Sequence, residues 1–225
     1  MTRNRIAIAI AAAALAVSAP AFAQQDIDKV NGSINVEAGQ SYGDLETVNG
    51  SIHLDDGARI EDASTVNGSI KAGDDLQAHS LETVNGGIRV GQRARIERGI
   101  ETVNGAVFVN RGSQVGDGIS TVHGGIGIVD TDLGGGIETV RGDITVGIGS
   151  HVKGGIRVEK PKGNNWGIQV GKNEPPKIVI GPGAVVEGPL VFERDVTLYV
   201  HATARTGKIT GATEIAFSTP TPPEN

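Results

Sequence analysis

The chain contains no cysteine and only seven aromatic residues, one Trp, two Tyr and four Phe, among 225. The absence of cysteine excludes disulfide bonds and a cysteine-borne lipid anchor. The scarcity of large rings argues against a compact globular core, which relies on aromatic side chains to fill volume. The 34 glycines stand among regularly spaced valines and isoleucines, a spacing that disordered chains lack. A thin and repetitive fold is therefore the better interpretation.

Positive charge is also scarce. The chain has 20 Lys and Arg residues against 26 Asp and Glu residues, a net charge of −6. Removing residues 1–23, which hold Arg3 and Arg5 and no acidic residue, gives 18 minus 26, or −8. With neither a concentrated basic patch nor a set of stacking aromatics, the sequence predicts no nucleic-acid partner.

The segment 1–23 has the features of a secretory signal peptide. Arg3 and Arg5 precede an apolar run, and Ala21-Phe22-Ala23 supplies the small-x-small pattern before a cleavage point. The alternative is a membrane anchor, but the apolar run is shorter than the ~20 residues of a spanning helix. No later segment is long and apolar enough to span. We therefore expect an exported protein, periplasmic, secreted or on the cell surface, with no membrane span after cleavage.

The strongest pattern is an internal repeat. The letters TVNGSI stand at 47–52 and 65–70, and TVNGGI stands at 83–88. The copies align on Val30, Val48, Val66, Val84, Val103, Val122 and Val140, so that the sequence numbers rise by 18 or 19 at every step. Self-similarity at a fixed period of this length is typical of a solenoid.

Each repeat carries apolar residues four and six positions after the aligned valine. The first series is Ile34, Ile52, Ile70, Ile88, Val107, Ile126 and Ile144; the second is Val36, Leu54, Ala72, Val90, Val109, Ile128 and Val146. This alternation predicts a short strand with one buried face. An array of hairpins is the alternative, because Asn-Gly between apolar residues also favours hairpins. Identical patterns in identical order favour an all-β fold, a single-stranded parallel β-helix with about 18 residues per coil.

Near the C-terminus the repeat changes from an 18-residue unit to six-residue periods. Six-residue periods run through Ile178, Ala184, Leu190, Val196 and Ala202 and through Ile180, Val186, Phe192, Leu198 and Ala204. Three such periods equal one repeat of the first kind, so one continuous core is expected. The predicted solenoid spans 24–217, with 18-residue repeats over 28–158, an excursion loop at 159–177 and hexads over 178–211. The proline-rich tail at 218–225 is predicted to be disordered.

Polar residues of the repeat predict two ladders. The asparagine that follows the aligned valine would stack from coil to coil and form a hydrogen-bonded row of Asn31, Asn49, Asn67, Asn85 and Asn104. Glycan binding by this row is the alternative. The threonines that precede the valine are expected to form a second ladder outside the coil: Thr47, Thr65, Thr83, Thr102, Thr121 and Thr139. His123 continues the asparagine row, and a lone histidine there is a weaker candidate for a catalytic base.

Three further features bear on sites. Aspartates recur in apparent corners as Asp55-Asp56, Asp74-Asp75, Asp130 and Asp132, and stacked carboxylates suit calcium, although solvated turns are the favoured interpretation. A glycosidase would need two acids across a cleft, which the sequence does not indicate. Trp166, in the excursion loop, is a candidate contact residue or a cover for the core. The sequence predicts no catalytic residue, metal or cofactor.

The repeats at 48–52 and 66–70, VNGSI, behind a signal peptide resemble a family of bacterial exported β-strand-repeat adhesins. The hexads in IVIGPGAVVEGPLVFERDVTLYV, residues 178–200, are similar to the β-helical core of bactofilins, which are polymer-forming cytoskeletal proteins. The resemblances cover most of the chain after residue 23 and imply a β-helical scaffold that can self-associate. Neither family implies a catalytic residue.

These expectations favour a non-enzymatic structural or adhesive scaffold of the bacterial cell envelope. Its expected partners are further copies of the chain, an envelope polysaccharide or an envelope protein. The alternative function is a β-helix that binds or cleaves envelope polysaccharide. Hexapeptide acyltransferases share the hexad style, but they generally use a histidine and a cytosolic acyl donor, so export argues against that activity.

Overall fold

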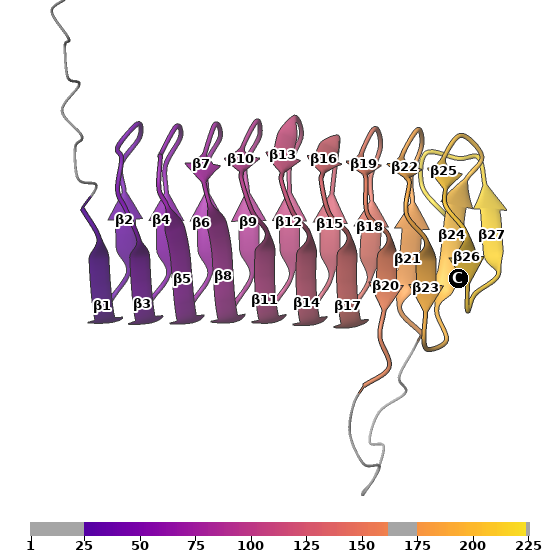
Figure 1. The fold of residues 1–225 in the computed structure, drawn as a ribbon, viewed down its shortest axis with the longest axis horizontal. Coiled ribbons are helices and arrows are strands. Elements are labelled where there is room, and N and C mark those ends of the chain that lie inside the picture. Colours follow the sequence, from indigo (N-terminus) through magenta and orange to yellow (C-terminus); the bar gives the residue numbers. More distant parts are fainter. Residues whose placement is uncertain (1–24, 162–174, 224–225) are drawn as a thin grey trace, which may run out of the picture.

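The protein is a straight rod built entirely of parallel strands (Figure 1). The computed structural model describes residues 25–161 and 175–223, and within these ranges there are 27 strands and no helix. The predicted parallel β-helix is confirmed, and the hairpin array is excluded because all strand pairs are parallel. The predicted signal peptide and Trp166 lie outside the described residues.

Three sheets form the sides of the rod, and we call them sheets A, B and C. Sheet A begins each coil and contains ten strands. Its strands are β1 (Ile27–Asn31), β3 (Leu45–Asn49), β5 (Asp62–Asn67), β8 (Ser80–Asn85), β11 (Ile100–Asn104), β14 (Ile119–His123), β17 (Ile137–Arg141), β20 (Ile156–Val158), β23 (Leu190–Phe192) and β26 (Ile209–Thr210).

Sheet B follows sheet A in each coil and also has ten strands. They are β2 (Ile34–Val36), β4 (Ile52–Leu54), β6 (Ile70–Ala72), β9 (Ile88–Val90), β12 (Val107–Val109), β15 (Ile126–Ile128), β18 (Ile144–Val146), β21 (Lys177–Ile180), β24 (Thr197–His201) and β27 (Glu214–Phe217). The nine spacings of about 4.8 Å between ten coils give a rod about 43 Å long.

Sheet C closes the third side with seven short strands. They are β7 (Gln77–Ala78), β10 (Arg95–Ile96), β13 (Ser113–Val115), β16 (Thr131–Leu133), β19 (His151–Val152), β22 (Val185–Val186) and β25 (Arg205–Thr206). Isolated bridges from Arg59 to Ser41 and to Gln77 extend this side toward the first coils.

The predicted apolar series line the interior. Ile34, Ile52 and Ile70 are at most 1% exposed, and one cluster of buried hydrophobic residues, nearly all aliphatic, runs from Ile34 to Val200. Equivalent residues of successive coils touch because the register pairs Ile34 with Ile52 and Ile52 with Ile70. Burying an aliphatic side chain of this size contributes roughly 1.5–3 kcal/mol, and the chain repeats that contribution in each coil.

The C-terminal coils depart from the expected hexads. Ile178, Ala184 and Leu190 are fully buried as predicted, but the register partner of Ile178 in the next coil is Leu198 and not Val196. A longer turn after β23 shifts the period, so Val196 is only partly buried and Ala202 is exposed. The prediction that Ala202 continues the inward series is wrong, whereas Val196 still packs against the core in a partly buried position. The period shifts because the coil from Ile178 to Leu198 is longer than three hexads.

One long insertion separates β20 from β21. Ile144 of β18 pairs directly with Ile178 of β21, although the insertion lies between them in the chain. The coil therefore resumes in register after the insertion, and the core is continuous across it. No described residue belongs to a helix long and apolar enough to cross a membrane.

Candidate functional surfaces

The asparagine row lies on the corner between sheets A and B. Each side-chain Nδ2 donates to the Oδ1 of the asparagine one coil earlier, with distances of 3.2, 2.9, 3.0 and 2.9 Å from the first pair to the last. The row comprises Asn31, Asn49, Asn67, Asn85 and Asn104. Each interior amide therefore uses one donor and one acceptor on its neighbours. This leaves less capacity for a ligand than an unpaired amide would have.

His123 and Arg141 occupy the same row in the next two coils. The register pairs Asn104 with His123 and His123 with Arg141. Both residues are exposed, and the His123 side chain has no hydrogen-bond or ion-pair partner among residues 25–161 and 175–223. A general base is held by a partner that fixes its tautomer and direction. Nothing in the described part of the chain does this for His123.

The threonines face the interior, and the prediction that they form an outer ladder is wrong. Thr47, Thr65 and Thr83 are at most 4% exposed. The Thr65 Oγ1 donates to the carbonyl oxygen of Gly50 at 2.8 Å, and that of Thr83 donates to Gly68 at 2.9 Å. The hydroxyl thus satisfies a carbonyl of the preceding coil's corner. Thr139, at the end of the row, is buried without such a bond to any described residue.

The valines between these threonines and asparagines point outward. Val48, Val66, Val84 and Val103 are 42%, 39%, 39% and 40% exposed. They stack in successive coils and form a continuous apolar stripe along sheet A, which we call the valine stripe: Val30, Val48, Val66, Val84, Val103 and Val122. Isolated exposed valines are ordinary, whereas a contiguous stripe marks a surface that another molecule can cover.

A row of acidic and serine residues runs beside the valine stripe, two positions earlier in each strand. In register the row reads Asp28, Glu46, Ser64, Glu82, Glu101, Ser120 and Glu138. We call it the acidic row. A shallow groove of about 460 Å³ lies between the row and the stripe, floored by the buried threonines. Sheet A thus has one acidic and one apolar wall.

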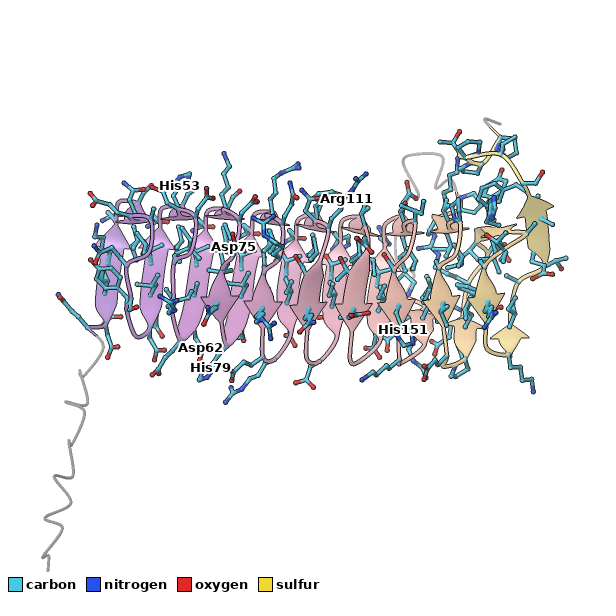
Figure 2. The ribbon with its side chains drawn as sticks, turned by 90° about the horizontal axis from the view of Figure 1, so that it is seen from above. His53, Asp62, Asp75, His79, Arg111 and His151 are labelled. Atoms are coloured by element: carbon cyan, nitrogen blue, oxygen red, sulfur yellow. The ribbon has the colours of Figure 1, made fainter. Side chains whose placement is uncertain are left out.

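Sheet B carries a row of opposite charge. Its outward residues in successive coils are Asn35, His53, Lys71, Arg89, Phe108 and Gly127. We call the segment from His53 to Phe108 the basic row. The Arg89 guanidinium lies 5.3 Å from the centre of the Phe108 ring, a cation–π distance. Lys71 has no ion pair within the described residues. Figure 2 shows His53 on the long edge of the rod opposite that of His79 and His151.

Sheet C is hollowed into a long groove. The groove has a volume of about 780 Å³, and its polar lining includes Arg59, Gln77, Arg95 and Gln114. These four residues alternate guanidinium and carboxamide groups in consecutive coils. None of the four side chains has a hydrogen bond or ion pair within residues 25–161 and 175–223.

Two histidines with carboxylate partners border the sheet C groove. The His79 Nε2 lies 3.1 Å from the Glu97 Oε2. His151 stands between two acids, with its Nε2 2.7 Å from the Glu187 Oε1 and its Nδ1 3.9 Å from the Asp132 Oδ1. Among the described residues, no serine or threonine hydroxyl is hydrogen-bonded to either imidazole. These contacts therefore activate no hydroxyl nucleophile for acyl transfer.

The corner aspartates act on the backbone of the next coil. The Asp56 Oδ1 accepts from the Asp74 amide and the Asp74 Oδ1 from the Gln92 amide, both at 2.8 Å. Asp75 forms two hydrogen bonds of 2.8 Å with Arg93, and this guanidinium lowers the pKa of its carboxyl. The carboxylates of Asp56, Asp74 and Asp75, three of the candidate calcium ligands, are thus used within the rod. No group of three or more His, Asp or Glu that could hold a metal ion occurs in the described part of the chain.

The comparisons with known proteins add no family to this geometry. No protein-family model matches the chain, and no curated protein or solved structure shows significant similarity to it. The class that the fold defines is a three-sided parallel β-solenoid of about ten coils with chemically distinct faces.

Proposed function

We propose that the protein is an exported, non-enzymatic scaffold of the bacterial cell envelope that works through repetitive surface contacts. The observation that carries this proposal is the segregation of its outer residues. Sheet A presents acidic, apolar and amide rows, and sheet B presents a basic row. Each row repeats about every 4.8 Å. A rod with rows of this kind offers many equal weak contacts in line, which suits avid binding to another periodic surface.

The rigidity of the rod supports the proposed scaffold function. A continuous aliphatic core runs through the coils, and the corners are held by asparagine, threonine and aspartate hydrogen bonds between neighbouring coils. The outer rows are thereby kept at fixed spacing. Binding to a rigid array costs less ordering entropy than binding to a flexible one.

A second candidate function is binding of envelope polysaccharide in the sheet C groove. The observation that favours it is the alternation of Arg59, Gln77, Arg95 and Gln114 along the groove, none of them paired within the described residues. Guanidinium and carboxamide groups supply the donors and acceptors that hydroxyl-rich chains need. A groove parallel to the rod would hold an extended glycan along several coils.

Export is tested by fractionation of cells that express the full chain. The scaffold proposal expects mature protein cleaved after Ala23 in the periplasmic, envelope or secreted fraction. Mass spectrometry of the purified protein reads the cleavage point. Uncleaved protein confined to the cytoplasm would contradict the proposal.

Binding and turnover are tested by incubating the purified protein with a panel of envelope polysaccharides and measuring both retention and released products. The variant Arg59→Ala/Arg95→Ala probes the groove, and Arg205→Ala, on the same sheet but outside the groove lining, is the matched control. Retention lost only in the double variant supports glycan binding. Reproducible product release would overturn the non-enzymatic assignment.

A further inference from the structure

We propose that sheet A of one copy docks sheet B of a second copy, with the acidic row and valine stripe covering the basic row. This inference deepens the proposed scaffold function, on which it rests, by naming the partner as a further copy of the chain. Its basis is the charge and spacing of the two faces, which differ in sign and share the same repeat along the rod.

The acidic row contains a repulsive pair. Glu82 of β8 and Glu101 of β11 are direct register partners on neighbouring strands. Like charges directly opposite each other destabilise a sheet. Neither carboxylate has an ion pair or hydrogen bond within residues 25–161 and 175–223. A cation from outside the rod would relieve this repulsion.

The basic row contains the complementary pair. Lys71 of β6 and Arg89 of β9 are also direct register partners and also repel each other. The described residues provide no acid that pairs with either side chain. Two adjacent cations on sheet B therefore match two adjacent anions on sheet A at one coil spacing of about 4.8 Å.

The residues that flank the two pairs also fit. The acidic row reads Ser64, Glu82, Glu101, Ser120, and the basic row reads His53, Lys71, Arg89, Phe108. This part of the acidic row reads Ser-Glu-Glu-Ser from either end of the rod. Lys71 and Arg89 therefore face the two glutamates whether the two rods run parallel or antiparallel. His53 and Phe108 then face serines, and the valine stripe lies beside the Phe108 ring.

The available area suits an interface of modest size. Sheet B limits the contact, because most of its strands have three residues and are about 10 Å long. Over nine coil spacings of about 4.8 Å this gives about 430 Å² per copy, which is typical of a weak interface and below the ~800 Å² per partner of a standard one. The contact is heterologous, since two different faces meet. Each added copy therefore presents a free face to the next one, and the assembly either closes into a ring or grows as an open array.

Sedimentation velocity of the purified protein tests the proposal. The expected result is concentration-dependent association at about 0.15 M ionic strength that weakens at about 1 M, because partly exposed charges are screened. The variants Glu82→Lys/Glu101→Lys and Lys71→Glu/Arg89→Glu should each weaken self-association by about 100-fold, about tenfold for each reversed charge. The control Glu37→Lys/Glu61→Lys reverses two acidic charges that lie outside the strands of sheets A and B, and it should associate as the native chain does.

A mixture of the two charge-reversed variants tests most directly whether sheet A of one copy contacts sheet B of another. Each variant alone presents like charges on sheets A and B, whereas the mixture again pairs opposite charges, so association should return. Circular dichroism and thermal unfolding of every variant confirm that the coils are intact. A strictly monomeric native chain, an equal loss in the control, or a mixture that stays monomeric would each overturn the docking. The export experiment does not depend on self-association. A failure of the scaffold proposal can therefore be told apart from a failure of the docking proposal.

Discussion

The coils from β1 to β11 and the coils after β17 share one core but differ in how strictly their outer residues repeat. In the first region the asparagine row is complete, and each asparagine bonds to its equivalent in the neighbouring coil. In the second region the steps along sheet B are unequal, because the register runs from Ile144 to Ile178, then to Leu198 and then to Glu214.

This comparison separates two requirements of the fold. An inward aliphatic residue is needed at each coil, since Leu81, Ile137 and Leu190 are all fully buried. A fixed coil length and a corner ladder are not needed. Extra residues are accommodated in the turns between strands, and the strands on either side still pair in register. The regular region has rows of identical side chains as a consequence of its fixed period, and those rows are what a repetitive partner would contact.

The largest expected effect concerns the corner glycines of the regular region. A Cβ on Gly86 would collide with the backbone carbonyl of Gly68 in the preceding coil, and a backbone cannot rotate away. Gly86→Ala is expected to cost about 3 kcal/mol of unfolding free energy. Gly127→Ala, on the outer face of sheet B, meets the Phe108 ring at 3.3 Å, and that side chain can move. Its expected cost is below about 1 kcal/mol. Urea unfolding measures both, and equal costs would contradict the close stacking of the corner.

The next effect compares two threonines of one row. Thr83→Val removes the hydrogen bond to the Gly68 carbonyl and leaves a part-buried acceptor unsatisfied, at a cost of about 1–3 kcal/mol. Thr139→Val removes a buried hydroxyl that has no partner in the described residues, so it should be neutral or stabilising. Chemical denaturation of the two variants checks the sign of the difference. A destabilised Thr139→Val would show that this hydroxyl is bonded in solution.

A smaller effect is expected in the asparagine row. Asn67→Ala removes one bond to Asn49 and one from Asn85, and exposed side-chain bonds of this kind contribute about 1 kcal/mol in total. His123→Ala, in the same row beyond the ladder, should change the unfolding free energy by less than about 0.5 kcal/mol. If the two variants unfold at the same urea concentration, the ladder contributes nothing to stability.

The smallest effect concerns pH. Arg93 lowers the pKa of Asp75 below its ordinary value of 3.8 through their hydrogen bonds. A carboxyl with a depressed folded-state pKa adds stability above its unfolded pKa and loses it as pH falls through the folded one. The native chain should therefore lose slightly more stability than Asp75→Asn on acidification below about pH 4. In an Arg93→Ala background the Asp75→Asn difference should vanish, and a difference that persists there would assign the effect to another group.

Much of the fold follows from the repeat alone. The spacing of Ile34, Ile52 and Ile70 gives the coil length, and their alternation with polar residues gives the inward face. The threonine row was misplaced because polarity favours solvent, whereas Thr47 shares the side of Leu45 two positions earlier. Its hydroxyl is satisfied by a carbonyl that only the stacked coil brings near.

The candidate surfaces were less accessible to sequence reasoning. Glu82 and Glu101 hold the same position in successive repeats, so their stacking could have been found from the repeat. Their position beside the valine stripe, and the basic row on another side, depend on where each coil turns. Non-glycine corners such as Asp75, Arg93 and Asp130, with φ of 58°, 56° and 45°, carry no simple sequence signal. The shift of the inward position from Val196 to Leu198 likewise depends on a turn that is longer than the equivalent turns of earlier coils.

The distance between Glu46 and Glu138 tests the stacking of coils most directly. These residues stand five coil steps apart on the acidic row, so their Cα atoms should be about 24 Å apart. Because the chain has no cysteine, Glu46→Cys/Glu138→Cys carries spin labels at those two positions alone. Double electron–electron resonance should give one narrow distribution near that separation, broadened only by the label arms. A broad distribution, or a single distance far from it, would contradict a rod of coils stacked in register.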